Sequence, residues 1–167
     1  GMGQKGMKFH IRIEGEPIAA QRPRFRRTSK GVLTHPTKKN HESLERIKMQ
    51  ASKQMEGKRK LEGPLEVRIM AMFPCTKSRV RKTKPALARF KDKGPDLDNI
   101  VKHYMDGLLA SGIVANDDNQ VVSLAASKIE LGQDAAPYTD ITIEEMFPKD
   151  EKNPFEDLIM AALSKVE

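Results

Sequence analysis

The sequence predicts a single α/β domain, α+β in its finer class, in which a mixed β-sheet of about four strands packs against helices. Three observations predict it. Several short segments alternate apolar with polar residues, as half-buried strands do. Other segments repeat apolar residues every three or four positions, as amphipathic helices do. The chain has 167 residues with no internal repeat or low-complexity linker, so we expect one domain over residues 1–167.

Four segments have the pattern of β-strands. The clearest is 65–73, where every second residue is apolar and prolines stand on both sides. Residues 9–14 alternate in the same way. Residues 120–131 are apolar enough to predict a largely buried strand, and 138–145 would place Ile141 and Ile143 inward. Because helical segments separate these strands, a mixed sheet is expected.

Three segments have helical periodicity. The strongest is 97–109, which Gly112 follows as a helix terminator. A second helix is predicted over 38–55, with a narrow apolar stripe. That stripe consists of Leu44, Ile47, Ala51 and Met55. A third helix is expected in 153–167, where an Asn-Pro pair is typical of a helix start, and it would pack on the sheet or in a dimer contact.

Composition bounds the cellular setting. Cys75 is the one cysteine, which excludes an intrachain disulfide and a zinc site built from cysteines. No apolar run approaches the roughly 20 residues of a membrane span, and no signal peptide is recognisable. Gly1 ahead of Met2 is interpreted as the scar of a removed tag. We therefore expect a soluble, cytoplasmic protein without a membrane partner or a small-molecule cofactor.

The charge is divided unevenly along the chain. Residues 1–93 hold 25 Lys and Arg against 8 Asp and Glu, a net charge of +17. Residues 94–167 hold 5 against 15, a net charge of −10. The first part therefore predicts a surface for a polyanion such as nucleic acid. Carboxylates near the same polyanion are explained if they hold metal ions, which attract phosphate.

Two basic segments are candidates for nucleic-acid contact. The first is an extended arm after the first strand, and the second is a long exposed loop over 76–93, mobile unless a ligand orders it. The candidate DNA-binding residues are Arg22, Arg24, Arg26, Arg27, Lys77, Arg79, Arg81 and Lys82. Each segment can also be interpreted as a solvated charged loop without a partner, and the residues leave that alternative open.

The acidic stretch 94–122 is the candidate catalytic site. Asp96 and Asp98 stand at the start of the 97–109 helix, and Lys102 lies one turn further on, away from the apolar face. Asp117 and Asp118 open the next strand, which can bring another carboxylate close. Carboxylates of this kind suit Mg²⁺, which keeps positions for water and phosphate oxygens. Such ions activate water and stabilise the attacking and leaving oxygens.

Each of these residues also has an ordinary structural interpretation. Asp96 or Asp98 can cap the helix, and Asp98 can form a surface ion pair with Lys102 four residues on. The Asp117-Asp118 pair can belong to a turn. From the residues alone, the metal site and these interpretations remain open.

The motifs PDLDNIVKHYMDGL and NDDNQVVSLAASK, together with GEPIAAQRPRFRR, resemble the RusA family of Holliday junction resolvases. The resemblance covers most of residues 9–145, with its motif core at 95–128. It implies a RusA-like fold and a homodimer that cuts four-way DNA junctions by paired symmetric nicks with Mg²⁺, for which Mn²⁺ substitutes. The segment 76–93 and the C-terminal helix exceed the compact family pattern.

The resemblance also assigns roles to residues. Asp96, Asp98 and Asp118 are implied as metal-binding catalytic carboxylates, and Lys102 as the catalytic lysine. Residues expected to support them are Asn99, Asp117, Gln120 and Lys128. Two alternatives remain beside this function: a nucleic-acid-binding module without catalysis, and a metal-dependent nuclease for other branched DNA or for RNA.

Overall fold

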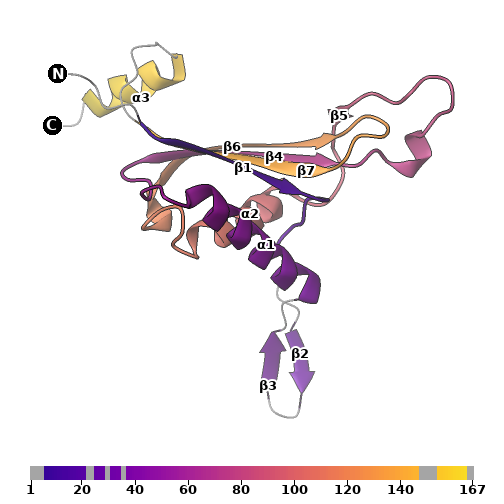
Figure 1. The fold of residues 1–167 in the computed structure, drawn as a ribbon, viewed down its shortest axis with the longest axis horizontal. Helices are drawn as coiled ribbons and strands as arrows, with labels where there is room; N and C mark the ends of the chain where they lie inside the picture. Colours follow the sequence, from indigo (N-terminus) through magenta and orange to yellow (C-terminus); the bar gives the residue numbers. More distant parts are fainter. Residues whose placement is uncertain (1–5, 22–24, 29–30, 35–36, 147–153, 165–167) are drawn as a thin grey trace.

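The computed structural model describes residues 6–21, 25–28, 31–34, 37–146 and 154–164. In this part of the chain, a sheet is covered on one face by two helices, and a small two-stranded hairpin projects from the helical side (Figure 1). The predicted α/β class and mixed sheet are confirmed. No helix among the described residues is both long and apolar enough to cross a membrane.

The described residues form one sheet of five strands in the order β1-β7-β4-β6-β5. These strands are β1 (Lys8–Glu14), β7 (Tyr138–Glu145), β4 (Leu65–Phe73), β6 (Val121–Glu130) and β5 (Arg89–Phe90). The β4–β6 pair is parallel, and the β1–β7, β4–β7 and β5–β6 pairs are antiparallel. The prediction missed β5 because two residues are too few to show alternation.

The helices are α1 (Lys38–Met55), α2 (Leu97–Leu109) and α3 (Pro154–Ser164). Thr37 caps α1, because its hydroxyl accepts a hydrogen bond from the Asn40 backbone N–H at 3.3 Å. Ile47, Ala51 and Met55 of α1 are buried, as the apolar stripe predicted. Leu44 is only half-buried, and the polar Ser43 is buried in its place.

One face of the sheet carries the core. Alternate residues of the strands point toward α1 and α2, so β1 buries Phe9, Ile11 and Ile13 while its other residues are exposed. Ile141 and Ile143 lie inward on β7, as predicted. Helix α2 approaches α1 closely at Gly107, where an added Cβ atom would lie 2.9 Å from Ile47 Cγ2.

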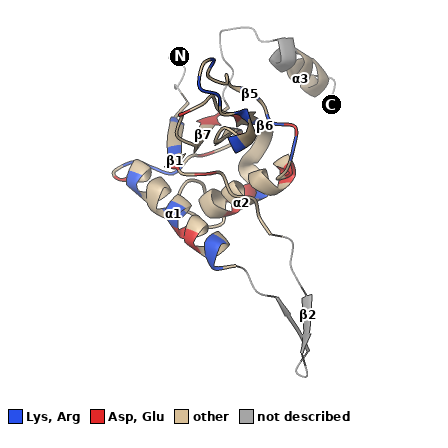
Figure 2. Ribbon diagram, turned by 90° about the vertical axis from the view of Figure 1, so that its right-hand side faces the viewer, with Lys and Arg blue, Asp and Glu red and all other residues tan. Residues whose placement is uncertain are grey.

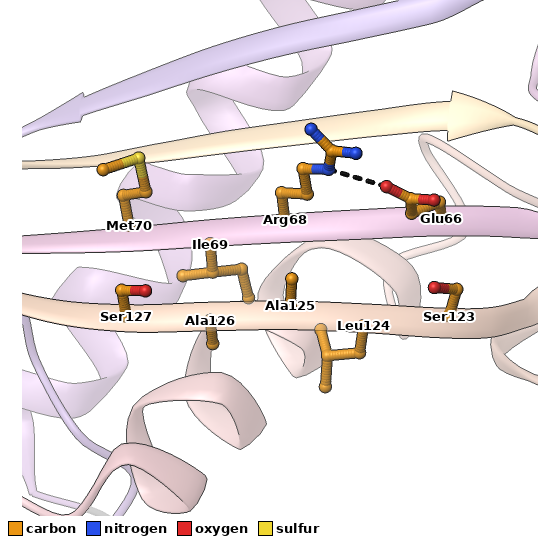
Figure 3. Close-up of a pocket in the computed structure, with 9 residues that line it drawn as sticks. All are labelled: Glu66, Arg68, Ile69, Met70, Ser123, Leu124, Ala125, Ala126 and Ser127. Carbon is orange, nitrogen blue, oxygen red and sulfur yellow. Dashed lines mark hydrogen bonds and ion pairs between the residues drawn. The ribbon is translucent and has the colours of Figure 1, made fainter. Parts of the chain in front are cut away.

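Among the described residues, no helix packs across the opposite face of the sheet (Figure 1). A shallow groove runs over β4 and β6 on this face, where the side chains of Glu66 and Arg68 form an ion pair of 2.6 Å (Figure 3). Ser123 and Ser127 line the same groove from β6. None of the sequence-predicted site residues lines it. The groove is therefore separate from the candidate catalytic site.

Strand β6 departs from the prediction of a largely buried strand. It pairs with β4 on one side, with a register shift that leaves out Val122, but on the other side β5 pairs only with Ile129 and Glu130. The outer edge of β6 over 121–127 thus has no strand beside it in the described part of the chain. Val122 and Leu124 are 62% and 48% exposed. An apolar sequence appears here at an edge, which strand periodicity alone does not distinguish from a buried position.

The predicted extended arm contains two short antiparallel strands, β2 (Phe25–Thr28) and β3 (Gly31–Thr34). They form a sheet of their own, apart from the five-stranded one (Figure 1). Backbone pairing holds this basic segment extended, which agrees with an arm. The clustered charges hid the alternation that would have predicted strands.

Candidate active site

The start of α2 carries two exposed carboxylates. Asp96 occupies the N-cap position of the helix, but its side chain makes no capping hydrogen bond. Asp98 lies in the first turn, where the helix dipole favours negative charge. Both residues are exposed. Among the described residues neither side chain has a hydrogen bond or ion pair, so the capping interpretation does not account for Asp96.

Lys102 lies one turn after Asp98 and is exposed. No ion pair joins Lys102 to Asp98 within the described ranges of the chain, although they stand four residues apart. The surface ion pair that would explain both residues structurally is therefore not formed. An unpaired lysine and two unpaired carboxylates thus remain within the first two turns of α2, available to a ligand that carries charge.

Lys128 holds the segment that leads into α2. Its Nζ atom donates hydrogen bonds to the carbonyl oxygens of Lys93 at 2.9 Å and Pro95 at 2.8 Å. The backbone N–H of Lys91 in turn donates to the Lys128 carbonyl at 3.0 Å. Lys128 therefore fixes the residue directly before Asp96. This contact supports the candidate site through the backbone.

The segment that leads to the β2–β3 hairpin runs beside the first turns of α2. The backbone N–H of Ala20 donates to the carbonyl of Asn99 at 2.9 Å, and that of Ile18 donates to the Tyr104 hydroxyl at 3.3 Å. Residues 18–20 thus run along α2 immediately before the arginine-rich arm. In Figure 1, α2 lies between the β2–β3 hairpin below it and β5 above it, and Figure 2 marks Lys and Arg in blue along the segment around β5.

Asp117 and Asp118 differ in their contacts. Asp117 caps the short helix η2 (Asp118–Gln120), and its carboxylate accepts a hydrogen bond from the Asn119 backbone N–H at 2.8 Å. Asp118 is exposed, and no side-chain partner is present for it among the described residues. Asp117 is therefore engaged in the turn, and Asp118 is the one free to bind.

The side chain of Gln120 holds the turn that carries Asp117 and Asp118. Its Oε1 atom accepts hydrogen bonds from the backbone N–H groups of Asn116 and Asp117, each at 2.9 Å. Its Nε2 atom donates to the carbonyls of Leu61 at 3.2 Å and Gly63 at 3.1 Å. One side chain thus ties the acidic turn to the loop before β4, which positions Asp118.

The two parts of the acidic set lie at opposite ends of β6. Strands β4 and β6 are parallel and α2 connects them, so α2 starts near the end of β4 and finishes near the beginning of β6. Pro95, before Asp96, contacts Lys128, whereas Asp118 precedes Val121. Seven residue steps from Val121 to Lys128 span about 23 Å.

A single chain therefore does not bring Asp118 to Asp96 and Asp98. Consistent with this, no group of three or more His, Cys, Asp or Glu side chains able to hold a metal ion is found in the ranges that the structure describes. Asp96 and Asp98 offer two carboxylates, which fits Mg²⁺, because this ion is usually held by one or two carboxylates with water and phosphate oxygens.

The candidate DNA-binding residues fall into four groups. Arg22 and Arg24 lie outside the described residues, and Arg26 and Arg27 lie on β2, where only the backbone is described. The exposed candidates on the 76–93 segment are Lys77, Arg81 and Lys82. Arg79 is engaged instead, because its guanidinium binds the carboxylate of Glu130 and donates to the Leu87 carbonyl at 2.8 Å.

Glu130 is a carboxylate that the sequence did not single out. It is 2% exposed, accepts hydrogen bonds from the Thr76 hydroxyl and Arg79, and lies 3.2 Å from Arg89 Nε. The hydrogen bond from Thr76, followed by Arg79 and Arg89, lowers the pKa of Glu130 to about 2. The signal that could have identified Glu130 from the sequence is its charge near the end of a predicted apolar strand, 120–131.

The comparisons with known proteins place the chain in a class of DNA-cutting enzymes. Residues 14–144 match the family of the endodeoxyribonuclease RusA. Because the match spans most of the chain, the protein belongs to the RusA endodeoxyribonuclease family. None of the curated proteins compared with the chain matches it.

Proposed function

We propose that this protein is a Mg²⁺-dependent, structure-selective endodeoxyribonuclease that resolves four-way DNA junctions by paired symmetric nicks. Membership of the RusA family supports hydrolysis of DNA. The observation that carries the proposal is the pair of exposed, unpaired carboxylates at the start of α2, beside Lys102 and between the β2–β3 hairpin and the basic segment around β5 (Figure 1). These residues lack a structural partner among the described residues, so binding to metal and phosphate accounts for them.

Asp96 and Asp98 would hold the metal ion through their carboxylate oxygens. When bound, the ion lowers the pKa of a coordinated water and stabilises charge on the phosphate. Mn²⁺ prefers the same oxygen ligands and is expected to substitute. Lys102 would place a positive charge beside the phosphate that is cleaved. The Asn99 carbonyl holds Ala20, just before the basic arm that would position the DNA.

Homodimer formation would complete the acidic set. The outer edge of β6 carries exposed apolar side chains at Val122 and Leu124. If two copies pair antiparallel along this edge, the beginning of one β6 lies beside the end of the other. Asp118 of a second copy then approaches Lys128, which contacts the segment before Asp96. A two-fold dimer also presents two equivalent sites to a two-fold junction.

Co-expression of two inactive variants tests this shared site. Asp98→Asn and Asp118→Asn chains should each be inactive as homodimers. In a mixed dimer with shared sites, one site carries both substitutions and the other carries neither. Random mixing should therefore restore about a quarter of the wild-type sites, which make single nicks. No recovery in a purified mixed dimer would show that each site is built from one chain.

The nicking assay on a four-way junction tests the catalytic proposal. We expect cleavage with Mg²⁺ or Mn²⁺, none with EDTA, and at least a 100-fold loss in Asp98→Asn, as when a group that stabilises the transition state is removed. Asp134→Asn is the matched control, because Asp134 is exposed and its positive φ of 68° suits asparagine.

The alternatives give different results in the same assay. Binding of the junction without metal-dependent nicking would indicate a nucleic-acid-binding module. Equal or faster cleavage of flaps or structured RNA would indicate a nuclease for another branched substrate. Undiminished cleavage by Asp98→Asn would remove the assigned site.

A further inference from the structure

The basic segment 76–93 exposes large apolar side chains. Phe90 and Leu87 are each 79% exposed, and Val80 is 55% exposed. By contrast, Phe9 and Phe73 are buried in the core. A phenylalanine this exposed leaves apolar surface in water, which is unfavourable by tens of calories per Å². It therefore indicates a surface that a partner covers.

The exposure of Phe90 and Leu87 is imposed by a fixed backbone. Glu130 binds Thr76, Arg79 and Arg89, which lie on both sides of the turn that contains Leu87. The Arg79 guanidinium also donates to the Leu87 carbonyl. The buried carboxylate of Glu130 thus joins the two ends of the segment. The exposure of Leu87 and Phe90 is therefore set by a backbone that these contacts hold in place.

Gln133 fixes the same segment from a second side. Its side chain accepts from the backbone N–H of Arg81 at 2.9 Å and donates to the Arg81 carbonyl at 2.9 Å. Its own backbone N–H donates to the Ala86 carbonyl at 2.9 Å. Gly132 lies directly against this backbone, since an added Cβ would be 3.1 Å from the Ala86 oxygen.

The fixed segment is continuous with the candidate active site. Phe90 pairs with Ile129 across β5 and β6, and Lys91 bonds the Lys128 backbone. The Lys128 side chain then contacts Pro95, the residue before Asp96. Phe90 is thereby held at the same end of β6 as Asp96 and Asp98.

The charge around Phe90 selects the chemistry of the partner. Residues 76–93 contain eight Lys and Arg and one Asp. Exposed cations there include Lys82, Lys84 and Lys93. Apolar or aromatic side chains within a cationic surface are suited to stacking against nucleobases whose phosphates the cations bind. An apolar protein partner would not require this density of positive charge.

We infer that Phe90, flanked by Leu87, forms a wedge that stacks on a nucleobase unstacked at the branch point of the DNA. This inference rests on the proposed function and identifies the feature of the substrate that the enzyme would select. A linear duplex keeps its bases stacked, and inserting a wedge there has an unstacking cost. A branch point has bases that unstack more readily, so the wedge favours branched DNA.

Binding of the full chain to a four-way junction and to a linear duplex tests the wedge, with Ca²⁺ in place of Mg²⁺ to prevent cleavage. Phe90→Ala should weaken junction binding about tenfold, within the range for loss of one stacked base. Its duplex affinity should change by less than about twofold. With 2-aminopurine at the branch, wild-type binding should change the fluorescence through base stacking, and Phe90→Ala should lose that change.

Two further variants serve as controls. Phe90→Trp keeps an aromatic face and should retain junction binding. Met49→Ala removes another large apolar side chain, 69% exposed, on α1, and should bind like wild type. Helix α1 packs against β1, the edge of the sheet opposite β5.

The outcomes separate this inference from the proposed function. If wild type binds and nicks junctions while Phe90→Ala retains wild-type junction affinity and 2-aminopurine signal, the wedge is wrong and the nuclease stands. If wild type neither binds nor nicks branched DNA, the proposed function fails, and the wedge fails with it. An equal loss on junction and duplex would also overturn the wedge, because it would show general contact.

Discussion

Glu130 and the Asp96–Asp98 pair are acidic residues in opposite circumstances. Glu130 is buried and has three partners, Thr76, Arg79 and Arg89, which hold its pKa near 2. Asp96 and Asp98 are exposed and have none within the described residues. A buried charge requires partners to be stable, whereas an exposed charge without partners is free for an external ligand. The difference separates a structural carboxylate from candidate catalytic ones.

Asp98→Asn should give the largest functional effect and the smallest structural one. Nicking should fall at least 100-fold, while the free energy of unfolding should stay within about 0.5 kcal/mol of wild type, because no structural contact is lost. Cleavage kinetics and urea unfolding of the same preparation measure both. A large loss of stability would show that Asp98 has a structural role after all.

Glu130→Gln should have the reverse pattern, with a large structural effect and a small functional one. Removing the charge leaves Arg79 and Arg89 without their carboxylate, and about 2–3 kcal/mol of stability should be lost. The folded pKa is depressed to about 2, so the stabilisation is present above the ordinary value of 4.5 and is lost as the pH falls from 4.5 toward 2. The variant should lack this part of the acid dependence. Unfolding measured from pH 6 to pH 2 in both proteins checks it.

The pKa of His103 is shifted by burial, whereas that of Glu130 is shifted by hydrogen-bonding and charged partners. His103 is 2% exposed and shares a hydrogen bond of 2.8 Å with Ser43, and burial lowers its pKa from 6.5 to about 4. The folded state therefore binds the proton less well than the unfolded state. Stability should be full above pH 6.5 and fall by up to about 3 kcal/mol as the pH drops toward 4.

Comparison with a His103→Gln variant, over pH 7.5 to 4, isolates this contribution. The variant has no titrating group at the position, so its stability curve should be flatter in that window. A curve parallel to that of wild type would assign the pH dependence to other groups.

Gly107→Ala should give the smallest effect and concerns the helix that carries Asp98. An added methyl group would meet Ile47 at 2.9 Å, and the resulting overpacking, about 1–3 kcal/mol, exceeds the gain in helix propensity of about 1 kcal/mol. We expect a net loss of about 1 kcal/mol in thermal or urea unfolding. Combining it with Ile47→Val should recover part of that loss if the contact is responsible.

The sequence predicted those elements whose periodicity reflects burial on one face. The 38–55 and 97–109 helices and the 65–73 strand were found with their observed bounds because each buries a regular stripe. Strand β6 was misjudged, since its apolar residues lie at an edge rather than in the core. The β2–β3 hairpin and β5 were missed because short strands dominated by charge lack a pattern.

The candidate residues were identifiable from the sequence, but their arrangement was not. The spacing of Asp98 and Lys102 follows from helix geometry alone. The position of Asp118 depends on the parallel pairing of β4 with β6, which a local pattern does not encode. Likewise, the link from Arg79 to Glu130 joins residues 51 positions apart, so Arg79 looked like a DNA contact.

The parallel pairing of β4 with β6 separates Asp118 from Asp98 within one chain. This separation bears on how activity depends on protein concentration. If each site needs carboxylates from two chains, a lone chain is inert toward DNA. At concentrations below that of half-assembly, the number of working sites grows with the square of the protein concentration. A cell that holds few copies would then be protected from stray nicking, and a modest rise in expression would switch cleavage on steeply.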